Sequence, residues 1–395
     1  MEGGLQAVDD VTRRWIGRNE ALDRLGIKTQ TLYAYVSRGR IIARPDPADS
    51  RRSLYDAEDI DRLLRGEGPA PRPTTAPDRS GVRGEADITS SLSVVADGRL
   101  FYRGLDAVQL AQQATLEEIA CRLWGLRDVH LFTGIKPRLD GVIGVSIRAR
   151  TFAILSRRAE EDVTSRACET EALKTQAACI LNETIDAASG PGPRLHFHQR
   201  LARAWKTVDR DSHMIRRALV LSADDELDSA VLAVRAAAGG GAPIAGAALA
   251  GLTTLVGSTV LRDLTDASTW VVDARRSPVE ASRRRLQETG SLPGFTAVAG
   301  SHDAGRAAAL LSAADLPADL RAVQQAGEAT GDGQATFAMA LAIIARRLEL
   351  PRQGAADLFM LGRLTGLLGH ALDQATNGSP IRARLRYVGP EPGAN

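Results

Sequence analysis

Apolar residues recur every three to four positions along most of this 395-residue chain, and that period predicts a mainly α-helical protein. The first such segment, residues 12–65, has clear helix boundaries: Asn19 can cap one helix, Gly26 can turn the chain, and Gly39 can end a second helix. The pattern predicts, in chain order, helices at residues 19–25 and 29–38, strands at 40–42 and 53–55, and a helix at 57–64.

Residues 66–86 are rich in proline and glycine and are expected to form a semi-extended linker. Periodic apolar helices then fill most of residues 87–390. One stretch of this region, between Arg235 and Arg262, carries no charge and is long enough to span a bilayer. A glycine triplet and a proline interrupt it, so the better explanation is two alanine-rich helices packed in a protein core.

Composition narrows the class of protein. Apolar residues make up 44% and aromatic residues only 4%, which favours tightly packed helices over a β-sandwich. The formal net charge of +2 gives no global basic field, so any contact with nucleic acid has to be local. The three cysteines, Cys121, Cys168 and Cys179, have no metal-ligand spacing and are expected to be buried, reduced thiols in a cytoplasmic protein. No metal site, membrane segment or signal peptide is expected.

Residues 20–41 read E-A-x-x-x-L-G-I-x-x-x-T-L-Y-x-Y-V-x-R-G-x-I, and residues 55–63 read Y-x-x-x-D-I-x-x-L. These motifs resemble the MerR-type winged helix-turn-helix, and the resemblance covers residues 12–65. It implies a helix that enters the major groove of double-stranded DNA and a wing that meets phosphates. Between Lys28 and Arg52, six basic residues stand against two acidic ones, a local excess of about +4 that suits phosphate contacts.

The DNA-contacting residues predicted from this pattern are Lys28, Gln30, Thr31, Tyr33, Arg38, Arg40, Arg51 and Arg52. Gln30, Thr31 and Tyr33 lie on the second helix, where they can reach base edges, and Tyr35 is an alternative to Tyr33. Arg51 and Arg52 lie in a basic turn between the two expected strands. The alternative is a helix-turn-helix that makes only protein contacts.

The C-terminal part of the chain carries a second resemblance. It contains F-M-L-G-R-L-T-G at residues 359–366, G-H-A-L-D-Q at 369–374 and I-R-A-R-L-R-Y-V-G-P at 381–390. Upstream, A-D-D-E-L-D-S at residues 223–229 is similar to the pattern A-D-H-E-L-N-x-S. Together these motifs resemble the citrate synthase family over residues 87–390.

This resemblance implies large and small all-helical domains, the small one at about residues 225–335, preceded here by the winged helix-turn-helix. It also implies a site for carboxylates, because the family condenses oxaloacetate with acetyl-CoA. Guanidinium groups bind carboxylates bidentately, and the three arginines of the family that do so fall on Arg306, Arg363 and Arg382. In the family the last of these reaches the partner subunit's site, so its presence implies a dimer.

The residues that perform the family's chemistry are replaced. That chemistry needs a carboxylate base and several histidines. The resemblance places Asp225, Val260 and Ala297 where the family has histidines, and Thr336 where it has the catalytic aspartate. Valine and alanine cannot transfer a proton, threonine is not a base near neutral pH, and a fixed negative charge at Asp225 would repel a dicarboxylate.

The sequence therefore predicts a cytoplasmic DNA-binding protein that forms homodimers. Its degenerate citrate-synthase-like domain would be a dimeriser and a sensor of a small carboxylate metabolite, without catalytic residues or a cofactor. Of the histidines, only His302 falls near a replaced position, and His370 is expected to be structural. Two alternatives stay open. An active citrate or methylcitrate synthase with an appended DNA-binding module would use oxaloacetate and acetyl-CoA, whereas an inactive subunit would pair with an active citrate synthase paralogue.

Overall fold

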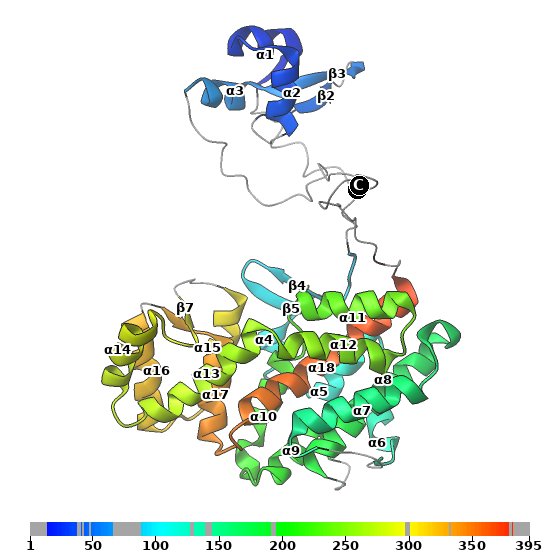
Figure 1. The fold of residues 1–395 in the computed structure, drawn as a ribbon, viewed down its shortest axis with the longest axis vertical. Helices are drawn as coiled ribbons and strands as arrows, with labels where there is room; N and C mark the ends of the chain where they lie inside the picture. The colour runs from blue at the N-terminus through cyan, green and yellow to red at the C-terminus, as the bar shows by residue number, and fades with distance from the viewer. Residues whose placement is uncertain are drawn as a thin grey trace, which may run out of the picture. The chain divides into compact units, whose positions relative to one another are not determined.

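A computed structural model of the chain divides it into two compact units, residues 1–83 and 84–395, each with its own hydrophobic core (Figure 1). The residues that the structure describes are 14–37, 41, 43–46, 49–65, 88–126, 130–138, 144–190, 195–296, 301–331, 333–378 and 381.

The first unit combines three helices with a three-stranded antiparallel sheet of order β1-β3-β2. Its elements are β1 (Trp15–Gly17), α1 (Arg18–Leu25), α2 (Thr29–Ser37), β2 (Ala43–Asp46), β3 (Asp49–Asp56) and α3 (Ala57–Leu64). The side chains buried in its core belong to Ile16, Ala21, Leu32, Ile41, Tyr55, Ala57 and Ile60. Tyr35 packs against this core from α2 and is half-buried.

Helix ends in this unit follow capping chemistry, with one correction. The N–H of Gly26, in the left-handed conformation, closes α1 on the Leu22 carbonyl at 2.9 Å, as the glycine predicts. The Asp56 carboxylate accepts from Glu58 and Asp59 N–H and starts α3. The expected cap at Asn19 is wrong, because β1 runs directly into α1 and leaves extended Gly17 as its cap.

The strands also differ from the prediction. The strand expected at residues 40–42 is found at Ala43–Asp46, and β1 was not predicted because three residues give too short a pattern. Arg51 and Arg52 lie within β3 and not in a turn, since β3 extends from Asp49 to Asp56 and forms the centre of the sheet.

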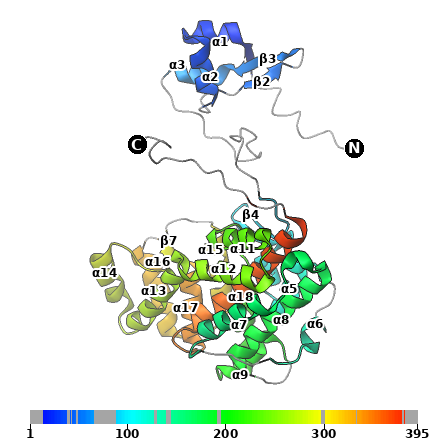
Figure 2. The same cartoon turned by 45° about the vertical axis from the view of Figure 1, so that its right-hand side comes forward.

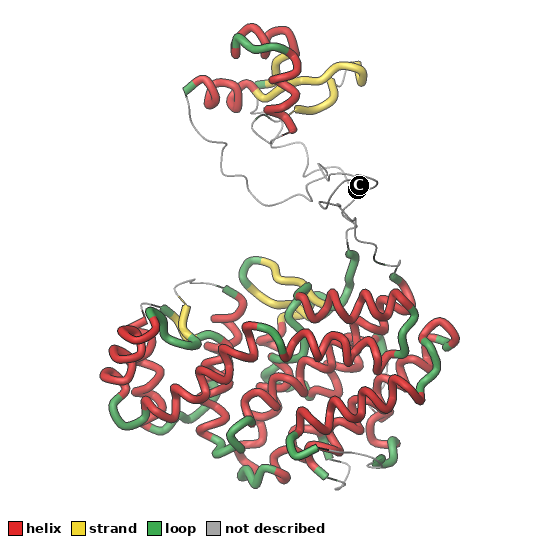
Figure 3. Tube along the Cα trace, viewed as in Figure 1, coloured by secondary structure: helices red, strands yellow, loops and turns green. Residues whose placement is uncertain are grey.

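The described residues of the second unit are mostly helical, and their strands form two small sheets (Figure 3). One sheet has the order β4-β5-β6, from Ser93–Ala96, Arg99–Tyr102 and Leu105–Asp106, and the other pairs β7 (Phe295–Thr296) with β8 (Gln334–Ala335). The helices are α4 (Ala107–Leu110), α5 (Leu116–Trp124), α6 (His130–Gly134), α7 (Ile147–Glu161), α8 (Thr170–Ser189), α9 (Phe197–Ala204), α10 (Ser212–Leu221), α11 (Ser229–Gly240), α12 (Ile244–Val256), α13 (Thr259–Ala274), α14 (Pro278–Thr289), α15 (His302–Ser312), α16 (Ala318–Gly331), α17 (Phe337–Arg347) and α18 (Gly354–Asn377), with short 3₁₀ turns at Ser165–Ala167 and Asp209–Asp211.

Helix α18 runs through the middle of this unit and is buried along most of its length (Figures 1 and 2). It is apolar on nearly all faces, the pattern of a central core helix, and it packs against α5, α8, α10, α11, α12 and α17. Gly362 and Gly366 let it approach the end of α10. A Cβ on Gly366 would lie 2.2 Å from the Ala223 carbonyl oxygen, which accepts the Gly366 N–H at 2.9 Å. Any side chain at position 366 would push α18 away from that loop.

The uncharged stretch predicted as two alanine-rich core helices is confirmed as α11 and α12, which pack against each other and against α18. In the described part of the chain, no single helix is long and apolar enough to cross a membrane. Helices α12 and α13 meet that test only as a pair, which is bent by 53°. All three cysteines are free thiols, but only Cys121 is fully buried, so the burial expected for Cys168 and Cys179 is only partly correct.

Asp357, in the first turns of α18, gives a pH-dependent prediction. Burial raises its pKa to about 6, against the opposing effect of Arg148 and Arg150. Because the folded pKa lies above the ordinary value of 3.8, ionising Asp357 destabilises the fold; the cost is absent below about pH 4 and complete above about pH 6. Asp357→Asn should therefore stabilise the protein by roughly 1–3 kcal/mol at pH 8 and by much less at pH 4.5.

Thermal unfolding of the wild-type and variant proteins at the two pH values measures this difference. Asp266→Asn, at an exposed position of α13, is the control and should change stability little at either pH. An equal effect of Asp357→Asn at pH 4.5 and pH 8 would contradict the assignment.

Candidate functional site

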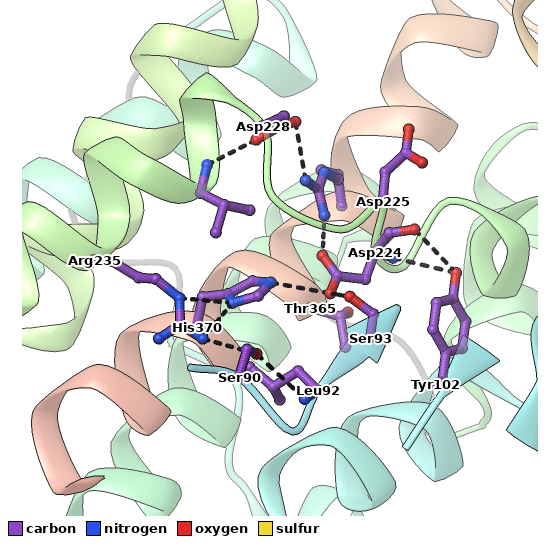
Figure 4. A network of polar contacts seen from close by, with 12 residues as sticks. Ser90, Leu92, Ser93, Tyr102, Asp224, Asp225, Asp228, Arg235, Thr365 and His370 are labelled. Carbon is purple, nitrogen blue, oxygen red and sulfur yellow. Dashed lines mark hydrogen bonds and ion pairs between the residues drawn. The ribbon is translucent and has the colours of Figure 1, made fainter. Parts of the chain in front are cut away.

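The loop between α10 and α11 carries three aspartates, Asp224, Asp225 and Asp228, that meet two buried arginines. Residue Glu226 of this loop has a φ of 56°, a left-handed conformation that a non-glycine residue adopts only under strain. The Glu226 carboxylate holds that conformation by accepting the Val95 N–H at 3.2 Å. The strained turn sends consecutive carboxylates in different directions, with Asp225 pointing away from the contacts of Asp224 (Figure 4).

Asp224 is completely buried and is surrounded by donors (Figure 4). Ser93 Oγ donates to Asp224 Oδ2 at 2.6 Å, His370 Nε2 donates to the same oxygen at 3.0 Å, and Arg363 Nη1 pairs with Oδ1. Burial alone would raise the pKa of Asp224, but His370 and Arg363 outweigh it and hold that pKa well below its usual range. Asp224 is therefore a fixed negative charge inside the protein.

Arg363, from the middle of α18, is also completely buried. Its second terminal nitrogen, Nη2, donates to Asp228 Oδ2 at 2.9 Å. Burial would lower the pKa of Arg363, but Asp224 and Asp228 raise it above its ordinary value. Both terminal nitrogens of this guanidinium group are thus occupied by carboxylates of the chain itself.

The Asp224 network continues to the start of the second unit. With His370 Nε2 donating to Asp224, His370 Nδ1 accepts from Arg235 Nε at 3.2 Å. Arg235 Nη2 also donates to Ser90 Oγ at 2.9 Å and to Asp373 Oδ2 at 2.7 Å. These contacts confirm the structural role expected for His370. Through Arg235, His370 joins α18 to α11 and to the segment before β4.

Asp225 forms a second group of contacts with α15. Arg306 Nη2 donates to Asp225 Oδ2 at 3.1 Å, and His302 Nε2 lies 2.8 Å from Oδ1. Arg306 Nη2 also donates to Asp303 Oδ1 at 3.2 Å, while the guanidinium group lies 4.7 Å from the centre of the Phe337 ring. Burial would raise the pKa of Asp225, but Arg306 and His302 keep it well below its usual range. Asp225 is therefore ionised and already paired.

Beside Asp225 lies a cavity of about 460 Å³ between α13, α15, α17 and the β7 segment. Its walls combine apolar and aromatic side chains with polar ones, and its charged groups among the described residues are Asp225, Asp263, Asp303 and Arg306. The remaining lining residues are Val260, Leu264, Ser291, Leu292, Pro293, Gly294, Phe295, Thr296, Thr336, Phe337, Ala338, Leu341 and Phe359. A volume of this size suits a small organic ligand.

Comparison with known proteins identifies the fold that builds this cavity. The family model "Citrate synthase, C-terminal domain" matches residues 145–384, which is more than half of the chain. The chain belongs to the citrate synthase family. No curated protein matches it.

Two solved citrate synthases share the fold. The enzyme from Thermotoga maritima aligns with a TM-score of 0.63 and 15% identity, covering 79% of this chain and 96% of its own. Citrate synthase from Thermoplasma acidophilum, in a ternary complex with carboxymethyl coenzyme A and oxaloacetate, aligns with a TM-score of 0.62 and 16% identity, covering 78% of this chain and 95% of its own. At these identities the likeness establishes the fold alone.

The structure brings together most of the positions predicted from the citrate synthase motifs. Asp225, Val260, Thr336 and Arg306 all line the cavity. Thr336 starts α17: its Oγ accepts from Met339 N–H and donates to the Gly294 carbonyl at 3.1 Å. Arg363 does not line the cavity, because Asp224 and Asp228 hold it in the interior. Ala297 and Arg382 lie outside the described residues.

The predicted DNA-contacting residues are only partly described. Lys28 and Arg52 are exposed, and Thr31 is half-buried. Arg38 and Arg40 lie outside the described residues, as do the side chains of Gln30, Tyr33 and Arg51, although the backbone of these last three belongs to α2 and β3. Contact with DNA stays a prediction for the whole set.

Sequence reasoning missed the partners of the arginines. Asp224, Asp228 and Asp303 were not singled out, and His302 was noted only as the histidine nearest a replaced position, with no partner assigned. One signal was available. Asp303 precedes Arg306 by three residues on a helix, a spacing that brings the two side chains together.

Proposed function

We propose that this protein is a dimeric DNA-binding regulator whose citrate-synthase fold serves as dimeriser and ligand sensor and does not condense an acyl-CoA with a keto acid. The observation that carries this proposal is the lining of the cavity. Three of the four positions that the family motifs assign to proton transfer or carbonyl polarisation, Asp225, Val260 and Thr336, face one cavity and have side chains unsuited to those roles.

Each of the three replacements has its own consequence. Val260 has no donor or acceptor, so it cannot stabilise an enol. The Thr336 hydroxyl is used in capping α17 and in a bond to Gly294, and a hydroxyl is not a base near neutral pH. Asp225 accepts from Arg306 and lies beside His302, so it presents negative charge where the family has a neutral or cationic donor.

The two described arginines also support a changed role. Arg306 and Arg363 were predicted to hold a small carboxylate, and both are paired with aspartates of this chain. Two of these aspartates, Asp225 and Asp228, stand where the family motif has histidine and asparagine. A carboxylate ligand of the predicted sensor would therefore have to compete with the protein's own carboxylates for these two arginines.

Dimerisation and DNA binding are the remaining parts of the proposal. Retention of Arg382, which in the family reaches the partner subunit, supports a homodimer. For DNA binding, the supporting features are the short helices α1 and α2 joined at Gly26, the adjoining hairpin of β2 and β3, and the basic residues from Lys28 onward. One such module binds weakly, so pairing through the second unit would fix the spacing of two half-sites.

Replacing Arg51 and Arg52 with alanine tests the DNA-binding part. Since phosphate contacts release counterions, the double variant should bind every duplex more weakly and should flatten the plot of log affinity against log salt by roughly two units. Gln30→Ala should instead change the preferred sequence, because that residue is assigned to base edges. Fluorescence anisotropy with labelled duplexes between 50 and 200 mM salt, about the range where such effects are large, measures both.

The matched control removes the same charge from the second unit. Arg283→Ala with Arg284→Ala, at exposed positions of α14, should leave DNA affinity and salt slope nearly unchanged. Identical affinity and slope for the wild type and the Arg51/Arg52 variant would contradict this mode of DNA binding.

A further inference from the structure

The charge of the cavity beside Asp225 has the opposite sign to the one that a dicarboxylate site requires. Among the residues that the structure describes, its charged lining residues are three aspartates, Asp225, Asp263 and Asp303, and one arginine, Arg306. The formal charges of these four residues sum to one minus three, or −2. An anionic ligand would therefore enter a site with excess negative charge, whereas a cation would be attracted.

The internal pairing leaves this excess in place. Arg306 shares one nitrogen, Nη2, between Asp225 at 3.1 Å and Asp303 at 3.2 Å, so a single positive charge serves two carboxylates. The second oxygen of Asp303 accepts only a neutral donor, the Phe337 N–H at 3.0 Å. Asp263, an exposed residue of α13, has no hydrogen-bond or ion-pair partner among the described residues.

The nearby arginine cannot supply the missing positive charge. Arg363 contacts Asp224 and Asp228, two further carboxylates, and does not line the cavity. Arg363 therefore adds no positive charge to the cavity, because two carboxylates outside the cavity already surround it.

Aromatic walls give a second, independent reason to expect an organic cation. Phe295, Phe337 and Phe359 line the cavity, and the face of an aromatic ring attracts a cation. The Phe337 ring already carries one such contact, with the Arg306 guanidinium group 4.7 Å from its centre. Within the described residues, no three His, Cys, Asp or Glu side chains are grouped to hold a metal ion, so a bare divalent cation fits the site less well.

We propose that this cavity binds a small organic ammonium ion, with its cationic group near Asp225 and Asp263 and a short apolar chain against the phenylalanines. A cavity of about 460 Å³ accommodates such a molecule. This assignment rests on the proposed function, since it names the class of ligand that the sensor domain takes.

Isothermal calorimetry on the full-length protein tests it, with matched probes that differ in charge. These are butylammonium and 1,4-diaminobutane as cations, butyrate and oxaloacetate as anions, butan-1-ol as the neutral analogue, and magnesium chloride as a metal. The ammonium probes should bind, and more weakly as salt is raised, because screening reduces the attraction of the aspartates. Asp263→Asn should weaken their binding about tenfold, in the range of a lost charge-assisted contact.

Replacing Asp263 leaves the internal ion pairs intact, so the Asp263→Asn variant should fold. Asp266→Asn removes the same charge from the same helix at a position outside the cavity and should leave binding unchanged. Equal binding of butan-1-ol and butylammonium would overturn the proposal in favour of a purely apolar site. Binding of oxaloacetate or magnesium without the ammonium probes would also overturn it, as would binding by no probe.

DNA affinity, measured on the same preparations, separates this inference from the proposed function. If ammonium probes bind but the protein has no affinity for DNA, the cavity assignment stands and the regulator fails. If DNA is bound and no ammonium probe is, the regulator stands and the cavity assignment fails.

Discussion

Replacing Arg363 with alanine is expected to lower the free energy of unfolding of the second unit by roughly 3–5 kcal/mol, because it leaves the buried Asp224 carboxylate without its cation. Arg363 and Asp224 are both completely buried, and Ser93 and His370 would be the remaining donors to Asp224. Asp228 would also lose its partner at 2.9 Å. Urea unfolding followed by circular dichroism measures the change.

Two further proteins show whether charge or volume is responsible. Arg363→Met combined with Asp224→Asn removes both charges of the pair. This double variant should recover much of the lost stability, because it leaves no unpaired charge at position 224. Arg138→Ala breaks an exposed pair with Glu161 and should change stability little. A loss below about 1 kcal/mol for Arg363→Ala would show that the Asp224 network is not essential to the fold.

The second large effect concerns catalysis. Purified protein supplied with oxaloacetate and acetyl-CoA should release coenzyme A no faster than the uncatalysed background, far below the roughly 1–10³ s⁻¹ of ordinary enzymes. Each absent acid–base group lowers a rate by about 10²- to 10⁴-fold, and Val260 and Thr336 replace two of them. These losses do not simply add, but either replacement alone lowers the expected rate far below that of an ordinary enzyme.

A thiol-reactive dye that reports free coenzyme A measures this rate, with a solved citrate synthase as the positive control. Asp225→His should remove one negative charge from the cavity and improve oxaloacetate binding, yet restore no turnover, since Val260 and Thr336 are unchanged. Turnover of order 1 s⁻¹ or more by the wild-type protein would contradict the proposed function and support an active synthase with an appended module.

Local chemistry explains why much of the fold could be predicted from the sequence. The 3.6-residue apolar period marks the helices, and Gly26 marks the end of α1. The spacing of Gly362 and Gly366 around Arg363 identified the family motif, and the structure shows why glycine is needed there. The strands of the first unit were misplaced because three- and four-residue strands carry too little periodic signal.

The charge state of the site lay beyond such local reasoning. The sequence placed Asp225, Val260, Thr336 and Arg306 at matching motif positions, and the fold does gather these four around one cavity. It could not show that Arg363 pairs with Asp224, 139 residues away, or that Arg306 pairs with Asp225, 81 residues away. Periodicity and capping depend on neighbours along the chain, whereas an ion pair depends on distance in space. Helices α18 and α15 pack against the α10–α11 loop, and this packing brings the aspartates to the two guanidinium groups. Only that tertiary contact decided which charges the cavity retains.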